Sequence, residues 1–336
     1  MNQMNRVVPI FFAADDRYAP CLSVAVRSIA AHASGDRDYR VHVLIDRMSR
    51  ENMAMLMSLG TENLTISFVN VGDKLDGIGS MMHLRDYYTQ ATYYRFFIPE
   101  LFPQYDKGLY LDCDIIALAD VADLYDTALG TNLLAAAPEE IMAMVDVFGR
   151  YVEACLGIPR ADYFSAGVLV MNLDRMRKVR IEQQFVDLLG RVRYRVTQDQ
   201  DYLNVLCKNR VCLLDTTWNR TACPGADAGT PPKLVHFKIN WKPWHYADVA
   251  FGGCFWAYAG ETPYLSILQR MLSDYTDAER ARDAGQYAAL TELAASEIRT
   301  WQHTHRPEST GCAAGGSAIP CRGMSFRMGQ PAARRS

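Results

Sequence analysis

Two aspartates separated by one residue are the first candidates for chemistry in this sequence. Asp112 and Asp114 directly follow the short apolar run at residues 108–111, which predicts a buried strand. Alternate side chains of an extended segment share a face, so both carboxylates can reach one hard divalent cation. Such an ion would neutralise a diphosphate and improve it as a leaving group. The alternative is a pair of solvated loop aspartates, because this pattern is weak on its own.

A second candidate lies far along the chain, at residues 236–245. His236 could supply a third metal ligand, and Lys242 offers a positive charge for phosphate oxygens. Two tryptophans and a proline in the same stretch would hold this loop rigid. The alternative is a core histidine beside a surface lysine.

Two further segments carry residues that would suit a ligand. Asp199 and Gln200 stand just before a helical pattern, where the alternative is simple capping and charge at a helix N-terminus. Residues 164–167 read Phe-Ser-Ala-Gly and lead a strand pattern. Small residues there would let backbone approach a ligand closely, and the alternative is a tight turn.

Strand and helix patterns alternate through the first two thirds of the chain. This alternation predicts an α/β fold with a mainly parallel sheet covered on both faces. Ligands of such sheets bind beyond the carboxyl ends of the strands, where the acidic pairs Asp15-Asp16 and Asp112/Asp114 lie. The expected strands are residues 7–14, 39–45, 64–71, 108–111, 132–137 and 166–171; the expected helices are 19–31, 49–59 with Ser49 as N-cap, 89–102, 181–192 and 200–207.

The last part of the chain differs in character. Residues 263–271 and 278–301 have helical patterns, so we expect a small C-terminal helical region over residues 261–304. Residues 305–336 are rich in Gly, Ala, Ser and Pro, with five arginines against Glu308, which predicts a disordered basic tail. Such a tail could make peripheral contact with an anionic membrane, and the alternative is a solvated extension.

Composition excludes several classes of protein. The chain has 336 residues, 35 Lys and Arg against 38 Asp and Glu, and a formal net charge of -3, which argues against nucleic-acid binding. We find neither an apolar run long enough for a membrane span nor a signal-peptide pattern. The nine cysteines are scattered without CxxC pairs. Reduced thiols in a cytoplasmic protein fit best, with the inner face of the membrane as a second possible place.

Six stretches, taken in order, resemble glycosyltransferase family 8. This family includes bacterial lipopolysaccharide galactosyl- and glucosyltransferases and, more distantly, glycogenin. The resemblance covers about residues 7–270. The matching stretches are residues 12–16 with Tyr18, Tyr94-Arg95, residues 110–114, residues 164–168, residues 199–204, and His236-Phe237 with Lys242-Pro243-Trp244.

The resemblance implies a nucleotide-sugar-binding, Rossmann-like fold called GT-A over residues 1–260. It would have a donor half at about residues 1–130 and an acceptor half at 131–260. It also implies Mn²⁺, with Mg²⁺ as the alternative, bound by Asp112, Asp114 and His236. Asp199 would hydrogen-bond the sugar hydroxyls and Gln200 would sit by the anomeric carbon. The implied donor-binding residues are Ala13, Asp15, Arg95, Asp112, Cys113, Ala166, Gly167, Asp199 and Lys242.

The expected activity is metal-dependent, retaining transfer of galactose or glucose from a UDP-sugar to a glycan or glycolipid acceptor. Lipopolysaccharide core or another surface glycan is the acceptor that the resemblance suggests. Two alternatives stay open: a non-catalytic nucleotide-sugar-binding protein and a phosphatase of the haloacid dehalogenase type. Two departures concern backbone contacts. Ser165 stands where many relatives carry Asn, and Ile239 and Asn240 occupy a stretch where many have a glycine.

Overall fold

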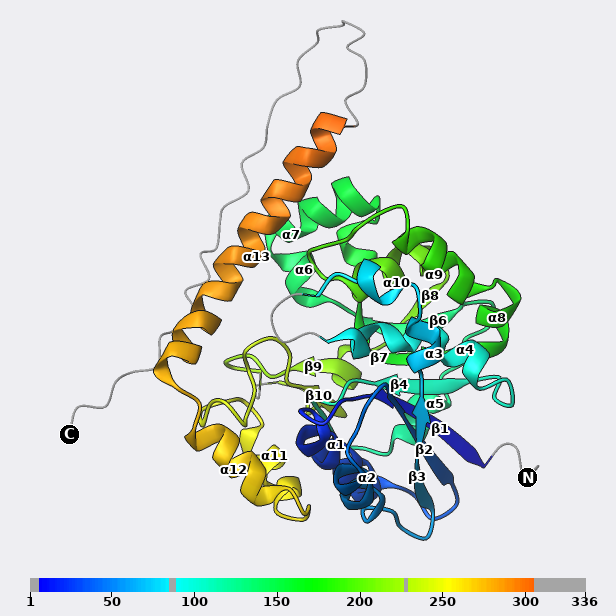
Figure 1. The fold of residues 1–336 in the computed structure, drawn as a ribbon, viewed down its shortest axis with the longest axis vertical. Helices are drawn as coiled ribbons and strands as arrows, with labels where there is room; N and C mark the ends of the chain where they lie inside the picture. Colours follow the sequence, from blue (N-terminus) through cyan, green and yellow to red (C-terminus); the bar gives the residue numbers. More distant parts are fainter. Residues whose placement is uncertain (1–5, 85–88, 227–228, 305–336) are drawn as a thin grey trace, which may run out of the picture.

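The computed structural model describes residues 6–84, 89–226 and 229–304. The expected disordered tail therefore lies outside the described residues. A seven-stranded sheet forms the centre of the molecule, with strand order β3-β2-β1-β4-β7-β6-β8 (Figure 1). Its strands are β1 (Val7–Ala13), β2 (Asp38–Ile45), β3 (Leu64–Asn70), β4 (Gly108–Leu111), β6 (Leu134–Pro138), β7 (Phe164–Met171) and β8 (Val211–Leu213).

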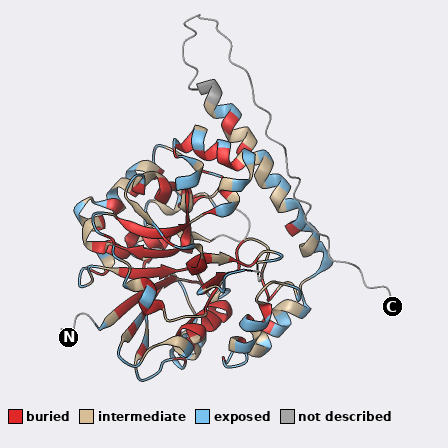
Figure 2. Cartoon of the chain, turned by 180° about the vertical axis from the view of Figure 1, so that it is seen from behind, coloured by how far each residue is buried: buried red, intermediate tan, exposed pale blue. Residues whose placement is uncertain are grey.

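The sheet is mainly parallel, as predicted. β1 pairs in parallel with both β2 and β4, and β2 and β6 pair in parallel with β3 and β8. Only β7 among these strands runs antiparallel to its neighbours, β4 and β6. Every residue of β7 is buried, and the sheet strands form the buried centre of Figure 2. The predicted α/β class with a mainly parallel central sheet is thus confirmed.

A second sheet of three short strands was not predicted. β5 (Ile115–Ala117) pairs antiparallel with β10 (Leu234–His236), which pairs in parallel with β9 (Arg220–Thr221). Runs of two or three residues give almost no periodic signal, so sequence patterns alone cannot find them. This small sheet matters because the pairing of β5 with β10 brings His236 next to the Asp112–Asp114 turn.

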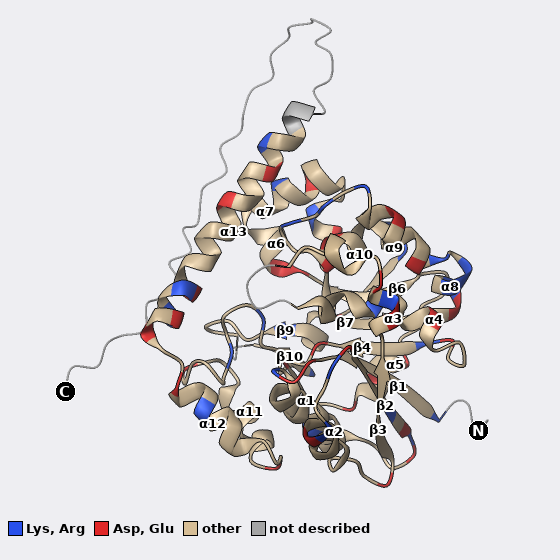
Figure 3. Cartoon of the chain, viewed as in Figure 1, with Lys and Arg blue, Asp and Glu red and all other residues tan. Residues whose placement is uncertain are grey.

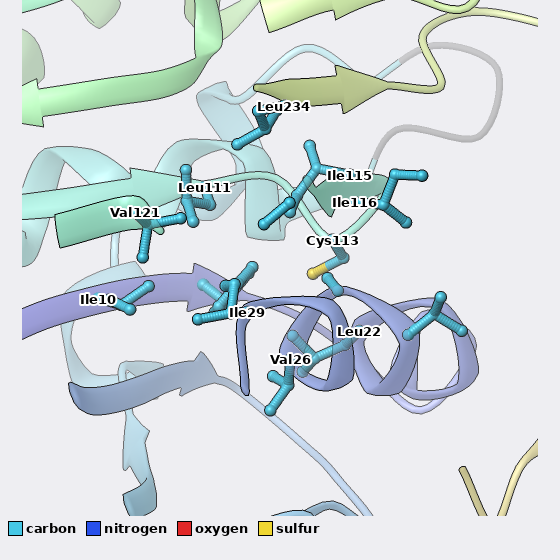
Figure 4. Packing of buried hydrophobic residues seen from close by; sticks show 14 of the residues in the cluster. Ile10, Leu22, Val26, Ile29, Leu111, Cys113, Ile115, Ile116, Val121 and Leu234 are labelled. Carbon is cyan, nitrogen blue, oxygen red and sulfur yellow. The ribbon is translucent and has the colours of Figure 1, made fainter. Parts of the chain in front are cut away.

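The first helix covers one face of the large sheet. In α1 (Ala19–His32), Leu22, Val26 and Ile29 lie on one side at helical spacing and are buried in the core (Figure 4). Pro20 lies in the first turn, where backbone N–H groups have no partner within the helix, so the missing N–H of proline costs no helical hydrogen bond. Ser49 caps α2 (Arg50–Met57) by accepting a hydrogen bond from the backbone N–H of Asn52, as predicted.

The other short helices fill the connections of the sheet, and the last two of them, over residues 252–259 and 265–273, pack against α1. The helix expected at residues 181–192 begins at the predicted residue and ends at residue 189, and the helix expected at residues 200–207 begins one residue earlier and ends as predicted. The helices are α3 (Gly72–Leu75), α4 (Ile98–Leu101), α5 (Val121–Tyr125), α6 (Glu140–Met144), α7 (Asp146–Tyr151), α8 (Leu173–Lys178), α9 (Ile181–Leu189), α10 (Asp199–Cys207), α11 (Gly252–Ala259) and α12 (Leu265–Ser273).

The segment expected as one helix over residues 89–102 is different. Residues Gln90–Phe97 form a 3₁₀ helix, and only Ile98–Leu101 continue as α-helix. Six of those eight 3₁₀ residues are buried, so tertiary packing rather than helix propensity sets this conformation.

One long helix closes the described chain. α13 (Asp277–Thr304) runs alongside α7 at the edge of the molecule (Figure 1), and it contacts α7 and the segment Val152–Leu156 that follows it. Its surface carries both signs of charge along its length, whereas the sheet strands are almost uncharged (Figure 3). Within the described ranges, every helix is too short or too polar to cross a membrane.

His42 on β2 is expected to make the stability of the fold depend on pH. Its ring stacks on Phe11 at 5.4 Å and hydrogen-bonds Ser67 Oγ at 2.8 Å and Tyr105 Oη at 3.1 Å. Burial, with a smaller effect of Arg40, lowers its pKa to about 4 from 6.5. Between these values the unfolded chain binds more protons, so the stabilisation is present above pH 6.5 and is lost as pH falls toward 4.

We therefore expect the free energy of unfolding to drop by about 1 kcal/mol more in the parent than in His42→Asn between about pH 7 and pH 5. Urea unfolding at the two pH values measures this difference. An equal drop in both proteins would contradict the assignment.

Candidate active site

The turn between β4 and β5 places the two aspartates. β4 ends at Leu111, and the backbone N–H of Asp112 donates to the Gly167 carbonyl on β7 at 2.8 Å. On the other side of the turn, Phe237 N donates to the Asp114 carbonyl at 2.9 Å. The β5–β10 register sets His236 opposite Ile115, which brings the imidazole beside the carboxylates.

Asp112, Asp114 and His236 converge. One ligand atom from each lies within 4.8 Å of the others. His236 Nε2 is 3.0 Å from Asp114 Oδ1 and 3.7 Å from Asp112 Oδ2. Asn219 Oδ1 lies 2.9 Å from the other ring nitrogen and fixes the ring orientation. Two carboxylates and an imidazole suit a divalent cation such as Mn²⁺, so the residues present fit the expected metal.

Lys242 is not on the surface, contrary to the simple alternative. It is 4% exposed, and its ammonium group donates to Asp114 Oδ2. Its Nζ also lies 5.5 Å from the centre of the Trp244 ring. Burial raises the pKa of Asp114, but Lys242 and His236 outweigh that effect and hold it well below its usual range. A buried ammonium beside the metal ligands is suited to phosphate oxygens.

Gly167 leaves room for the site. A Cβ on Gly167 would lie 2.6 Å from Asp112 Oδ2 and 2.9 Å from His236 Nδ1, and it would also collide with His236 Cε1. The Phe164–Gly167 segment is strand rather than the tight turn that was the alternative. Glycine is therefore required at this position because a larger residue would displace the side chains of Asp112 and His236.

Arg95 connects three parts of the site from the 3₁₀ helix. Its guanidinium donates to Asp112 Oδ1 at 3.1 Å and to the Ala166 carbonyl, and its Nε lies 3.2 Å from Asp199 Oδ2. It also packs over the Tyr110 ring at 4.2 Å. The side chain is 2% exposed. The described bonds of Arg95 therefore go to other protein groups. Through them, Arg95 orients the carboxylates of Asp112 and Asp199.

The first turn of α10 brings Asp199 and Gln200 into the same cavity as Asp112 and Arg95. The helix begins at Asp199 with Gln198 as N-cap, one residue earlier than predicted. Burial raises the pKa of Asp199 to about 7, although Arg95 opposes this shift. Gln200 Oε1 accepts from Ala166 N at 2.9 Å, and its Nε2 donates to Tyr163 Oη at 3.4 Å. The Gln200 amide is therefore held in a defined orientation.

One cavity joins these residues. Asp15 is the one predicted site residue outside its lining, because its carboxylate accepts from the backbone N–H groups of Arg17 and Tyr18. Cys113 donates from Sγ to the Ala13 carbonyl at 3.2 Å. The predicted residues that do line the cavity are Ala13, Arg95, Asp112, Cys113, Asp114, Ala166, Gly167, Asp199, Gln200, His236 and Lys242.

Sequence reasoning missed several residues of this cavity. Ile239 was noted from the sequence, and its φ of 53° lies in the left-handed region that favours the glycine of many relatives. Glu139 and Lys238 were missed, and they form a buried ion pair at 2.9 Å. Single residues of these types carry no pattern, so only an alignment or the fold could have found them. The other missed lining residues include Ile141, Met142, Phe148, Gln286, Tyr287 and Leu290.

Comparisons with known proteins agree with this geometry. The sequence profile of glycosyl transferase family 8 matches residues 9–248. The chain belongs to glycosyltransferase family 8. Among solved structures, it is similar to the galactosyltransferase LgtC in complex with donor and acceptor sugar analogues. The TM-score is 0.65 and the identity 29%, over 76% of this chain and 96% of LgtC.

Other relatives match this chain over only part of their own length. The bifunctional glycosyltransferase WbbM matches with a TM-score of 0.72 and 27% identity, over 80% of this chain and 52% of that one. The glycosyltransferase GlyE of Streptococcus pneumoniae is 26% identical over 71% of this chain and 57% of its own length. A Haemophilus influenzae relative is 24% identical, and the chain covers 64% of that protein. The chain thus spans less than two thirds of these two curated relatives.

Proposed function

We propose that this family 8 protein is a metal-dependent, retaining hexosyltransferase. It takes galactose or glucose from a UDP-sugar and passes it to a glycan or glycolipid, such as lipopolysaccharide core or another surface glycan. The observation that carries this proposal is the convergence of Asp112, Asp114 and His236 in one cavity with Lys242 and Gln200. Family membership argues against the haloacid dehalogenase alternative.

The donor would lie across the carboxyl ends of β1 and β4. Ala13 and Asp15 at the end of β1 would hold the uracil, and Cys113 would keep the neighbouring turn in place through its bond to Ala13. Lys242 would hold the diphosphate. A Mn²⁺ ion bound by the two aspartates and His236 would supply charge neutralisation of the leaving diphosphate. The sugar would rest near Arg95, Asp199, Ala166 and Gly167.

Retention of configuration requires either two inversions or attack from the face of the leaving group. Gln200 is a poor nucleophile because its amide oxygen is neutral and already accepts from Ala166 N. We therefore favour front-face attack, in which a diphosphate oxygen accepts the proton of the acceptor hydroxyl. Gln200 supports the positive charge that develops at the anomeric carbon, with its amide held by Tyr163 and Ala166.

Gln200→Ala should lower kcat by about 10- to 100-fold, because an oriented dipole near the developing charge is lost. The dissociation constant for UDP should stay close to that of the parent. Steady-state kinetics and calorimetry measure the two quantities. Gln183→Ala, on the exposed surface of α9, is the matched control and should keep full activity. A covalent sugar trapped on Gln200 or Asp199 would overturn front-face attack.

The proposed function is tested by UDP release from a panel of UDP-sugars with Mn²⁺ and without acceptor. We expect slow release with one hexose, faster on adding a glycoside, and none when the metal is chelated. Binding of UDP-sugars with no release on any acceptor would support the non-catalytic alternative. Membrane contact by residues 305–336 stays a prediction, because that tail lies outside the described residues.

A further inference from the structure

The cavity of the active site continues into a part that the donor residues do not occupy. α6 and α7 supply Ile141, Met142 and Phe148 to its lining, and α13 supplies Tyr287 and Leu290. The Tyr287 and Phe148 rings meet edge to face, with centroids 6.0 Å apart and an interplanar angle of 89°. This part is therefore an apolar wall, unlike the charged end around Asp112, Asp114 and Lys242.

The wall belongs partly to a region outside the family profile. The family 8 match ends at residue 248, whereas α13 spans Asp277–Thr304 and runs along α7 (Figure 1). Within the lining, Gln286 adds one polar group from the same helix. Side chains beyond the part of the chain that matches the family profile can therefore influence which substrate binds here.

α13 is fixed to the loop that carries Lys242. The Asp283 carboxylate accepts from Tyr246 Oη at 2.9 Å and from Tyr275 Oη at 2.6 Å. Asn240 Nδ2 donates to the Asp283 carbonyl at 2.8 Å, and Arg280 donates to the His245 carbonyl at 3.0 Å. Asp283 is 4% exposed. These partly buried hydrogen bonds hold the apolar wall in a set position relative to the donor end of the cavity.

A polar pair lies within the same lining. Lys238 Nζ bonds Glu139 Oε2 at 2.9 Å, and both side chains are at least nine-tenths buried. Glu139 Oε1 has no hydrogen-bond partner among the described residues. A buried carboxylate oxygen without a partner is costly, and a substrate hydroxyl would satisfy it. The cavity therefore offers a hydroxyl acceptor next to an apolar surface.

We propose that this part of the cavity is the acceptor subsite and that α13 selects a glycoside with an apolar aglycone. The proposal rests on the proposed transferase function. Contact with Tyr287, Leu290 and Phe148 would not stabilise a charged diphosphate. An alkyl aglycone would bind more tightly there because its apolar surface is removed from water. The acceptor sugar lies between this wall and Gln200, with Glu139 within reach of its hydroxyls.

The test compares octyl and methyl glycosides of galactose and glucose as acceptors, with UDP release as the readout. In the parent we expect kcat/KM about tenfold higher for the octyl compound, equivalent to about 1.4 kcal/mol. Tyr287→Ala and Leu290→Ser should remove this preference. Their acceptor-dependent release should fall about tenfold more than their acceptor-free release.

Two further variants keep the proposal testable if Tyr287→Ala or Leu290→Ser weakens the packing of α13. Gln286→Trp fills the cavity without hollowing the wall, and it should lower transfer to both glycosides more than acceptor-free release. Arg282→Ala, exposed on the same helix, is the control and should behave as the parent. Thermal unfolding of each variant reports whether α13 stays packed.

The outcomes separate the two proposals. Equal use of octyl and methyl glycosides by the parent would overturn the acceptor subsite alone. So would an octyl preference that survives Tyr287→Ala, together with parental transfer rates in Gln286→Trp. No UDP release from any UDP-sugar, with or without acceptor, would overturn the transferase proposal and the subsite with it.

Discussion

Replacing Gly167 with alanine is expected to lower metal-stimulated UDP release on the order of 100-fold, because a shift of about 1 Å in a catalytic group has effects of that size. The added methyl would lie 2.6 Å from Asp112 Oδ2 and 2.9 Å from His236 Nδ1, too close for either side chain to keep its place. Both proposed ligands must move apart. Mn²⁺ titration followed by calorimetry should show weaker binding alongside the lost turnover.

The control is a glycine with space around it. A Cβ on Gly253 in α11 would meet no described heavy atom within 4 Å, so Gly253→Ala should keep full metal affinity and activity. Overpacking at Gly167 also costs about 1–3 kcal/mol of stability, which thermal unfolding measures separately. Gly167→Ala with unchanged Mn²⁺ affinity would contradict the metal assignment.

Asp114→Asn is expected to reduce UDP release by about 100- to 1,000-fold, the effect of losing one group that stabilises transition-state charge. The carboxylate contacts both His236 and the ammonium group of Lys242. Its loss also leaves a buried lysine without its anion, at a cost of about 3–5 kcal/mol in unfolding free energy. Activity and stability should therefore fall together.

A double variant separates these effects. Asp114→Asn combined with Lys242→Met removes the buried positive charge together with the carboxylate that balances it, so part of the stability should return while activity stays lost. Asp123→Asn, on the exposed face of α5, is the control and should match the parent in both measurements. Full metal-dependent turnover in Asp114→Asn would remove the site assignment.

Long periodic segments were predictable from local sequence. β1, β2 and β3, the amphipathic helix α1 and the Ser49 cap of α2 all lie within a residue or two of their expected bounds. Each has a signal that depends only on neighbouring residues. The segment Gln90–Phe97 failed this rule, because its residues are buried on several sides and tertiary packing decided between 3₁₀ and α-helix.

The candidate site divides in the same way. Asp112 and Asp114 are separated by a single residue and follow a strand, so their shared role could be predicted from spacing. The burial of Lys242 and the orientation of His236 by Asn219 depend on segments far apart in the chain. No spacing rule relates such residues.

The sequence by itself determined the mainly parallel α/β order of the chain, the acidic turn after β4 and the family. Those features follow from periodicity and from short runs that keep their residues next to each other. Only the tertiary structure decided that β5 and β10 pair, which sets His236 opposite Ile115, and that α13 reaches the cavity with Tyr287. Short strands and long-range contacts are chosen by packing of the whole chain, which local patterns do not record.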